Sequence, residues 1–142
     1  MATKIPEAGH VIKYSYLWWN EHRKGRVEGL KDRPCSVLLN QKNEQGKTTL
    51  YVLPITHTPP INPEFGIEIP SRTKQRLGLD EQRSWVITTE FNKFTWPGYD
   101  IRRLDTGLFS YGVLPEKLIK EIIKSVQFHA QKNKSNAVTR DE

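Results

Sequence analysis

Val27-Glu28-Gly29-Leu30-Lys31-Asp32-Arg33-Pro34 leads directly into the apolar run Cys35-Ser36-Val37-Leu38-Leu39. A continuous apolar run of this length, opened by a proline, predicts a buried strand. Gly29 gives the loop before it a point where the backbone can turn. The stretch therefore places Arg33 where a stiff strand meets a flexible loop.

Arg33 has two interpretations at this position. A guanidinium on a rigid edge matches two phosphate oxygens at once, which favours phosphate recognition. The alternative is an ion pair with Glu28 or Asp32 that only ties down the loop. The sequence alone leaves both open.

The bulk composition fits a single domain over residues 1–142, with a core at about 9–128 and loose tails at 1–8 and 132–142. Lys and Arg total 22 against 16 Asp and Glu, and the net charge of +6 favours an anionic partner such as nucleic acid or an acidic protein. Cys35 is the single cysteine, so no disulfide within the chain is possible. No apolar stretch approaches the ~20 residues that span a bilayer, and we expect a cytoplasmic protein without membrane contact.

The segment before the opening stretch combines a strand with a basic loop. Residues 11–18 predict a strand in which Ile12, Tyr14, Tyr16 and Trp18 share one face. Cations that follow phosphates beside rings that stack on bases are typical of a single-stranded nucleic-acid surface. The alternative is a solvated loop next to core tryptophans. The candidate RNA-binding residues here are Trp18, Trp19, His22, Arg23, Lys24, Arg26 and Lys31.

A second candidate for chemistry follows the predicted strand at 48–55. Thr56 and His57 lie before Pro59 and Pro60, which end regular structure. A hydroxyl can orient a phosphate, and histidine is the usual acid or base near neutral pH. The alternative is turn chemistry, in which threonine hydroxyls bind nearby backbone groups.

The remainder of the chain predicts short strands and one helix. Strands are expected near 65–69, 85–89, 92–96 and 101–104. Residues 71–80 form a basic linker, for which a helical turn is one alternative. Its Arg72 and Lys74 are further candidate RNA contacts. Leu118, Ile119, Ile122, Ile123 and Val126 recur at helical spacing after Pro115, which predicts a helix packed on the core. Six or seven short strands closed by a helix predict a small, mostly β barrel.

Five short motifs occur in a specific order: Gly9-His10-Val11-Ile12, Glu28 to Pro34, Val52 to Thr56, Phe94-Thr95-Trp96, and Gly112 to Glu116 entering a helix. Together they resemble the MazF/PemK family of toxin endoribonucleases from bacterial toxin–antitoxin modules, over roughly residues 9–126. That resemblance implies an SH3-like barrel with a C-terminal helix, usually as a homodimer. It implies cleavage of single-stranded RNA without metal or cofactor, by attack of the ribose 2′-hydroxyl, and an acidic antitoxin as partner.

The resemblance also assigns roles to residues. The family's arginine before proline falls on Arg33, its threonine after Pro-Ile falls on Thr56, and an acidic loop residue falls on Glu28. His57 is our addition as a proton carrier. The chain departs from the family at His10, where an acidic residue is common, and in its longer segment between Thr56 and Trp85. A protein-binding module of the gyrase-inhibitor kind and an RNA-binding module without cleavage are the alternatives.

Overall fold

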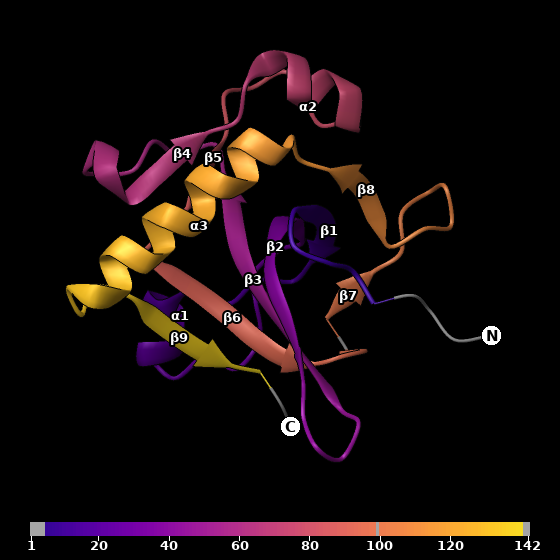
Figure 1. Cartoon of the computed structure of the whole chain (residues 1–142), viewed down its shortest axis with the longest axis vertical. Helices are drawn as coiled ribbons and strands as arrows, with labels where there is room; N and C mark the ends of the chain where they lie inside the picture. Colours follow the sequence, from indigo (N-terminus) through magenta and orange to yellow (C-terminus); the bar gives the residue numbers. More distant parts are fainter. Residues whose placement is uncertain (1–4, 99, 141–142) are drawn as a thin grey trace.

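The computed structural model describes residues 5–98 and 100–140 and shows a mostly β chain with one long helix (Figure 1). The N-terminal half contains β1, α1, β2, β3, a 3-10 turn and β4, and the rest follows from α2 onward. The bounds are His10–Tyr14 (β1), Trp19–Arg23 (α1), Arg33–Lys42 (β2), Thr48–Thr56 (β3), Pro63–Phe65 (3-10 turn), Gly66–Glu68 (β4), Ser71–Leu77 (α2), Trp85–Ile87 (β5), Glu90–Thr95 (β6), Ile101–Arg102 (β7), Ser110–Val113 (β8), Glu116–Gln131 (α3) and Asn136–Thr139 (β9).

The described strands form one nine-stranded sheet. Its main path runs β4-β5-β3-β2-β1-β7, β8 also pairs with β1, and β6 pairs with β3 and β9. All pairs are antiparallel except β6 with β9, which is parallel. The mostly β prediction is thus confirmed, together with the C-terminal helix. The sheet is not closed into a barrel.

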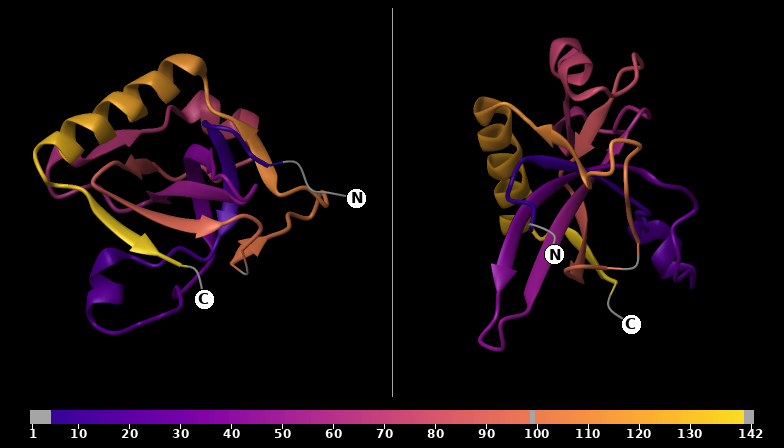
Figure 2. Two further views of the ribbon diagram at one scale, coloured as in Figure 1. Left: turned by 60° about the horizontal axis from the view of Figure 1, so that its bottom comes forward. Right: turned by 90° about the vertical axis from the view of Figure 1, so that its right-hand side faces the viewer.

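Helix α3 covers one face of the sheet (Figures 1 and 2). Leu118, Ile122 and Val126 are buried in one core cluster with residues of β1, β2, β3 and β5. Ile119 and Ile123 are partly buried against the same cluster. The predicted apolar stripe is therefore a core face, as its helical spacing indicated.

A second core cluster joins β1 to β2, β3 and β6. Ile12, Tyr14 and Tyr16 are buried in it, and Trp18 packs against it while partly exposed. The predicted face is correct, but the strand ends at Tyr14 rather than Trp18. Cys35 is fully buried here, as expected for the apolar run that predicted a buried strand.

Strands β2 and β3 form a long hairpin (Figure 1), and its register contains a bulge. Near the turn, Lys42 pairs with Thr48 and Leu39 with Tyr51. Beyond Leu38 the register shifts by one residue, so that Val37 pairs with Val52 and Cys35 with Pro54. A bulge of this kind adds one residue to one strand and turns the following side chains to the other face. The shift decides which β3 residue lies level with Arg33.

The segments on either side of this hairpin are more ordered than the sequence predicted. The predicted loop after Trp18 contains α1. The linker at 71–80 contains α2, which bears out the helical alternative there; the helix ends at Leu77, and Gly78 after it has the left-handed conformation. Strand β8 was not predicted. Each of these elements is short and polar or mixed, so its hydrophobic pattern is weak.

The prediction of loose tails is wrong within the described residues. Residues 136–139 form β9 beside β6, and the Arg140 guanidinium is buried on Asp100 at 2.7 Å. At the other end, Pro6 is buried and Ile5 packs against the second core cluster. Residues 1–4, 141 and 142, also part of the predicted tails, lie outside the described residues.

Gly29 is required because its surroundings leave no room for a side chain, and not because its backbone conformation needs glycine. An added Cβ would lie 2.5 Å from the Tyr16 carbonyl oxygen and 2.8 Å from Ser15 Oγ, and Gly29 does not have a positive φ. We expect Gly29→Ala to lower the free energy of unfolding by about 1–3 kcal/mol, because the backbone must move to admit the methyl group. Urea unfolding measures this, with Leu30→Ala as the control, since Leu30 is exposed. Equal effects of the two changes would contradict the steric explanation.

Candidate functional site

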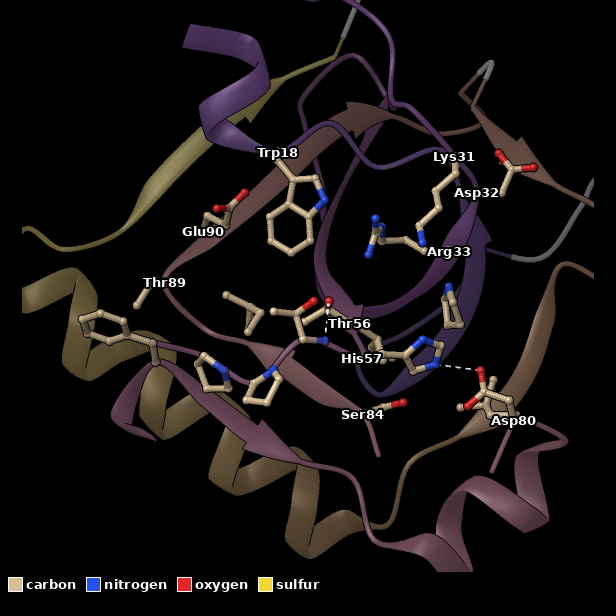
Figure 3. A pocket seen from close by; sticks show the side chains of 18 of the residues that line it. Trp18, Lys31, Asp32, Arg33, Thr56, His57, Asp80, Ser84, Thr89 and Glu90 are labelled. Carbon is tan, nitrogen blue, oxygen red and sulfur yellow. Dashed lines mark hydrogen bonds and ion pairs between the residues drawn. The ribbon is translucent and has the colours of Figure 1, made fainter. Parts of the chain in front are cut away.

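A pocket of about 1020 Å³ opens beside the end of the β2–β3 hairpin that carries Arg33 and Thr56 (Figure 3). Its walls come from the segment at 18–21, the start of β2, the end of β3 and the segment after it, α2 and the segment after it, the end of β5, the start of β6, and β8. The lining residues are Trp18, Trp19, Asn20, Glu21, Lys31, Asp32, Arg33, Pro34, Ile55, Thr56, His57, Thr58, Pro59, Pro60, Ile61, Phe65, Lys74, Gly78, Leu79, Asp80, Ser84, Ile87, Thr89, Glu90 and Tyr111.

Arg33 lies at the first position of β2 with its side chain toward the pocket (Figure 3). Its guanidinium lies 5.0 Å from the centre of the Trp18 ring, and its Nε is buried without a hydrogen-bond partner. Asp32 pairs with Arg102 instead, at 3.3 Å. Arg33 forms no ion pair with any residue in 5–98 or 100–140, so the proposed pairing with Glu28 or Asp32 is wrong.

Thr56 ends β3 next to Arg33. The register after the bulge pairs Cys35 with Pro54, and two residues further along each antiparallel strand Arg33 is level with Thr56. The Thr56 hydroxyl accepts a hydrogen bond from the Thr58 amide at 3.1 Å, so the predicted turn chemistry is present as well. The hydroxyl hydrogen remains available to a ligand oxygen.

His57 is held by a carboxylate that is itself held by a lysine. His57 Nε2 lies 2.7 Å from Asp80 Oδ2, and Asp80 Oδ1 accepts from Lys74 Nζ at 2.8 Å. The hydrogen bonds from Lys74 and His57 hold the pKa of Asp80 below its usual value, although burial opposes the shift. An ionised Asp80 places the imidazole proton on Nε2, which leaves Nδ1 as the base.

Lys74 was predicted as an RNA contact, but its ammonium group forms hydrogen bonds within the fold. The residue is buried, and Nζ donates to Asp80, to the Gln82 carbonyl and to Ser84 Oγ. These three acceptors use all three ammonium protons. Lys74 therefore positions Asp80 and does not face a ligand.

Glu90 was not predicted from the sequence, although it lines the same pocket. Its Oε1 accepts hydrogen bonds from Tyr16 OH and from the Trp19 amide, each at 3.0 Å. Two residues later on β6, the Asn92 side chain binds both backbone groups of Leu17. Alternate polar residues of β6 thus fix the segment that carries Trp18 and Trp19.

No family model, curated protein or solved structure matches this chain. The resemblance to MazF/PemK toxins therefore depends on the motifs alone. Within residues 5–98 and 100–140, no group of three or more His, Cys, Asp or Glu side chains could hold a metal ion. None of the helices in those ranges has the length and apolar character to cross a membrane.

The other predicted residues divide between the pocket and the surface. Trp18, Trp19 and Lys31 line the pocket with Arg33, Thr56 and His57. Glu28 is exposed in the loop and is not among the lining residues, so the structure does not bring it to the other candidates. The remaining RNA-binding candidates are exposed on α1, the following loop and α2, outside the lining: His22, Arg23, Lys24, Arg26 and Arg72.

Burial raises the pKa of Glu90 above 4.5, against the hydrogen bonds from Trp19 and Tyr16. The folded chain then binds more protons than the unfolded chain between pH 4.5 and the raised pKa. The contribution of Glu90 to stability is therefore complete below this window and is lost as the pH rises through it. We expect Glu90→Gln to remove this decline. Urea unfolding between pH 4 and 8 measures the difference, and identical pH profiles for both proteins would contradict it.

Proposed function

We propose that the chain is an endoribonuclease that cleaves single-stranded RNA through its own side chains. The observation that carries the proposal is Arg33, a guanidinium without an ion pair among the described residues, beside a hydroxyl and a carboxylate-held imidazole. An arginine that stabilised only the fold would be expected to meet a carboxylate. Here the charge remains available to a ligand in the pocket.

The three side chains supply what transesterification of RNA requires. His57 Nδ1 takes the proton of the 2′-hydroxyl as its oxygen attacks the adjacent phosphorus. Arg33 and the Thr56 hydroxyl bind the phosphate oxygens, on which negative charge grows in the crowded intermediate. The bond from phosphorus to the 5′-oxygen then breaks, and that oxygen takes a proton from solvent. The products are a cyclic phosphate and a 5′-hydroxyl end.

The surroundings of the pocket support a polyanionic substrate. The net charge of the chain is +6, and three exposed Lys and Arg candidates, with His22 before them, follow Trp19 on α1 and in the next loop. Lys31 adds a positive charge at the pocket itself. Basic residues beside partly exposed tryptophans suit single-stranded RNA, because the cations bind phosphates while the rings stack on bases.

The same proposal includes the finer properties that the MazF/PemK resemblance implies. These are a homodimer and an acidic antitoxin that competes with RNA for the basic face. The chemistry above does not require them, since all of its groups come from one chain.

Incubation of the purified protein with a long single-stranded RNA in excess chelator tests the proposal. We expect discrete cuts with cyclic-phosphate ends. His57→Ala should lower the cleavage rate by about 10²–10⁴-fold, because it removes the general base. Thr56→Ala should lower it less, since it removes one uncharged donor.

Glu44→Gln is the control for both variants, because Glu44 is exposed at the turn of the β2–β3 hairpin, away from the pocket. RNA that stays intact but binds to the folded protein would favour an RNA-binding module. RNA that is neither cut nor bound would favour a protein-binding module.

A further inference from the structure

The pocket extends beyond the three reactive side chains. In Figure 3, Trp18 stands between Arg33 on one side and Glu90 on the other, with Thr89 nearby. Phe65 and Ile87 also line the pocket and give it apolar surface. A flat, partly exposed ring with a carboxylate next to it is a different chemical environment from the phosphate-binding side at Arg33.

The carboxylate of Glu90 is fixed in place, but only one of its oxygens is used. Oε1 accepts both hydrogen bonds, from Tyr16 OH and the Trp19 amide. Oε2 accepts none from any residue in the described ranges. The side chain is thus held rigidly while one acceptor oxygen stays available.

A purely structural role does not explain why this residue is charged. A glutamine oxygen could accept the same two hydrogen bonds, and a half-buried carboxylate is costly to desolvate. Glu90 forms no ion pair with a described cation that would offset this cost. The charge is explained if a ligand brings N–H donors to Oε2.

We propose that Trp18 and Glu90 form a nucleobase subsite that selects guanine next to the phosphate bound by Arg33. The base stacks on the Trp18 ring, and its adjacent N1–H and N2–H groups face the Glu90 carboxylate. Uracil has one N–H flanked by two carbonyl oxygens, and cytosine and adenine place a ring-nitrogen lone pair beside their amino group. Guanine alone offers two neighbouring donors.

This inference assumes that the pocket binds RNA, as the proposed function requires, but it does not assume that the RNA is cut. Its test therefore uses 2′-O-methyl RNA, which binds without a free hydroxyl to attack. Fluorescein-labelled uridine hexamers with one central guanosine, adenosine, cytidine or uridine are titrated with protein, and the fluorescence anisotropy is recorded. Cleavage of ordinary RNA is measured in parallel.

We expect the guanosine hexamer to bind about ten- to a hundredfold more tightly than the all-uridine hexamer. Glu90→Gln should abolish this preference, because its amide NH₂ replaces an acceptor with a donor. Trp18→Leu should weaken binding of all four hexamers through the lost stacking. Glu44→Gln, the matched control, should keep the preference. Thermal unfolding establishes that each variant is folded.

Each outcome decides the question. Equal binding of the four hexamers, or a guanosine preference that survives in Glu90→Gln, overturns the subsite even if the protein cleaves RNA. A preference lost in Glu90→Gln establishes the subsite, even if ordinary RNA stays intact and the cleavage proposal fails. Absence of binding to every hexamer overturns the subsite, and absence of both binding and cleavage overturns the proposed function as well.

Discussion

Replacement of Arg33 by alanine is expected to lower RNA cleavage by about 10²–10³-fold and to leave the protein folded. The guanidinium lies level with Thr56 across the hairpin, and no described carboxylate neutralises it. Negative charge on the phosphate oxygens grows during the attack, so a fixed positive charge stabilises the transition state more than the bound substrate. Its loss should therefore reduce kcat more than it raises KM.

The expected stability effect of the same change is small. Arg33 contacts the Trp18 ring but forms no ion pair with the described residues, and a contact of this kind contributes about 0.5–1 kcal/mol. Arg33→Lys should restore only part of the activity, because a lysine cannot bind two phosphate oxygens with a planar fork.

Single-turnover cleavage of a labelled RNA, together with urea unfolding, measures both effects. Arg83→Ala is the control for lost charge, since Arg83 is exposed, pairs with Glu68 and does not line the pocket. An Arg33→Ala protein that cuts RNA at the rate of Arg83→Ala would remove Arg33 from the proposed chemistry.

Replacement of Arg140 by alanine is expected to destabilise the fold by about 3–5 kcal/mol. The Arg140 side chain is only 4% exposed and its Nη2 donates to Asp100 at 2.7 Å. Nη1 donates to the Ser15 carbonyl and to Asn92 Oδ1. Removal of the guanidinium leaves Asp100 with its longer ion pair to Arg102, at 3.8 Å, and takes from the Ser15 carbonyl its Arg140 donor.

Urea unfolding near neutral pH measures this loss, with the exposed Arg72→Ala as control. Asp100→Asn and the double variant complete a cycle that isolates the ion pair from the other hydrogen bonds. If Arg140→Ala lowers the free energy of unfolding by less than about 1 kcal/mol, the size typical of surface ion pairs, the pair does not hold the fold together.

The sequence predicted the elements whose pattern is strong and local. The helical spacing of Leu118, Ile122 and Val126 gave α3, and the apolar alternation at 48–55 gave β3 nearly to the residue. Strand β9 was missed, because Asn136 to Thr139 contains one buried side chain and becomes a strand only by pairing with β6. Nothing within those four residues indicates that partner.

Part of the candidate site was predictable, because its residues lie in local sequence patterns that can be recognised. Arg33, Thr56 and His57 were selected by residue type and by the motifs around them, and the pocket contains all three. Their arrangement depends on the bulge at Leu38, because the register of the hairpin turn, continued without it, would put His57 level with Arg33. Glu90 was missed because a glutamate beside a predicted strand usually faces solvent.

Arg140 also bears on the order in which the chain can fold during its synthesis. Its hydrogen bond to the Ser15 carbonyl joins groups 125 residues apart, and through Asn92 it supports the segment that holds Trp18. A ribosome releases the N-terminal partner first and Arg140 much later. The tryptophan wall of the pocket therefore gains this support only after nearly the whole of this sequence has been translated, and the emerging chain lacks it until then.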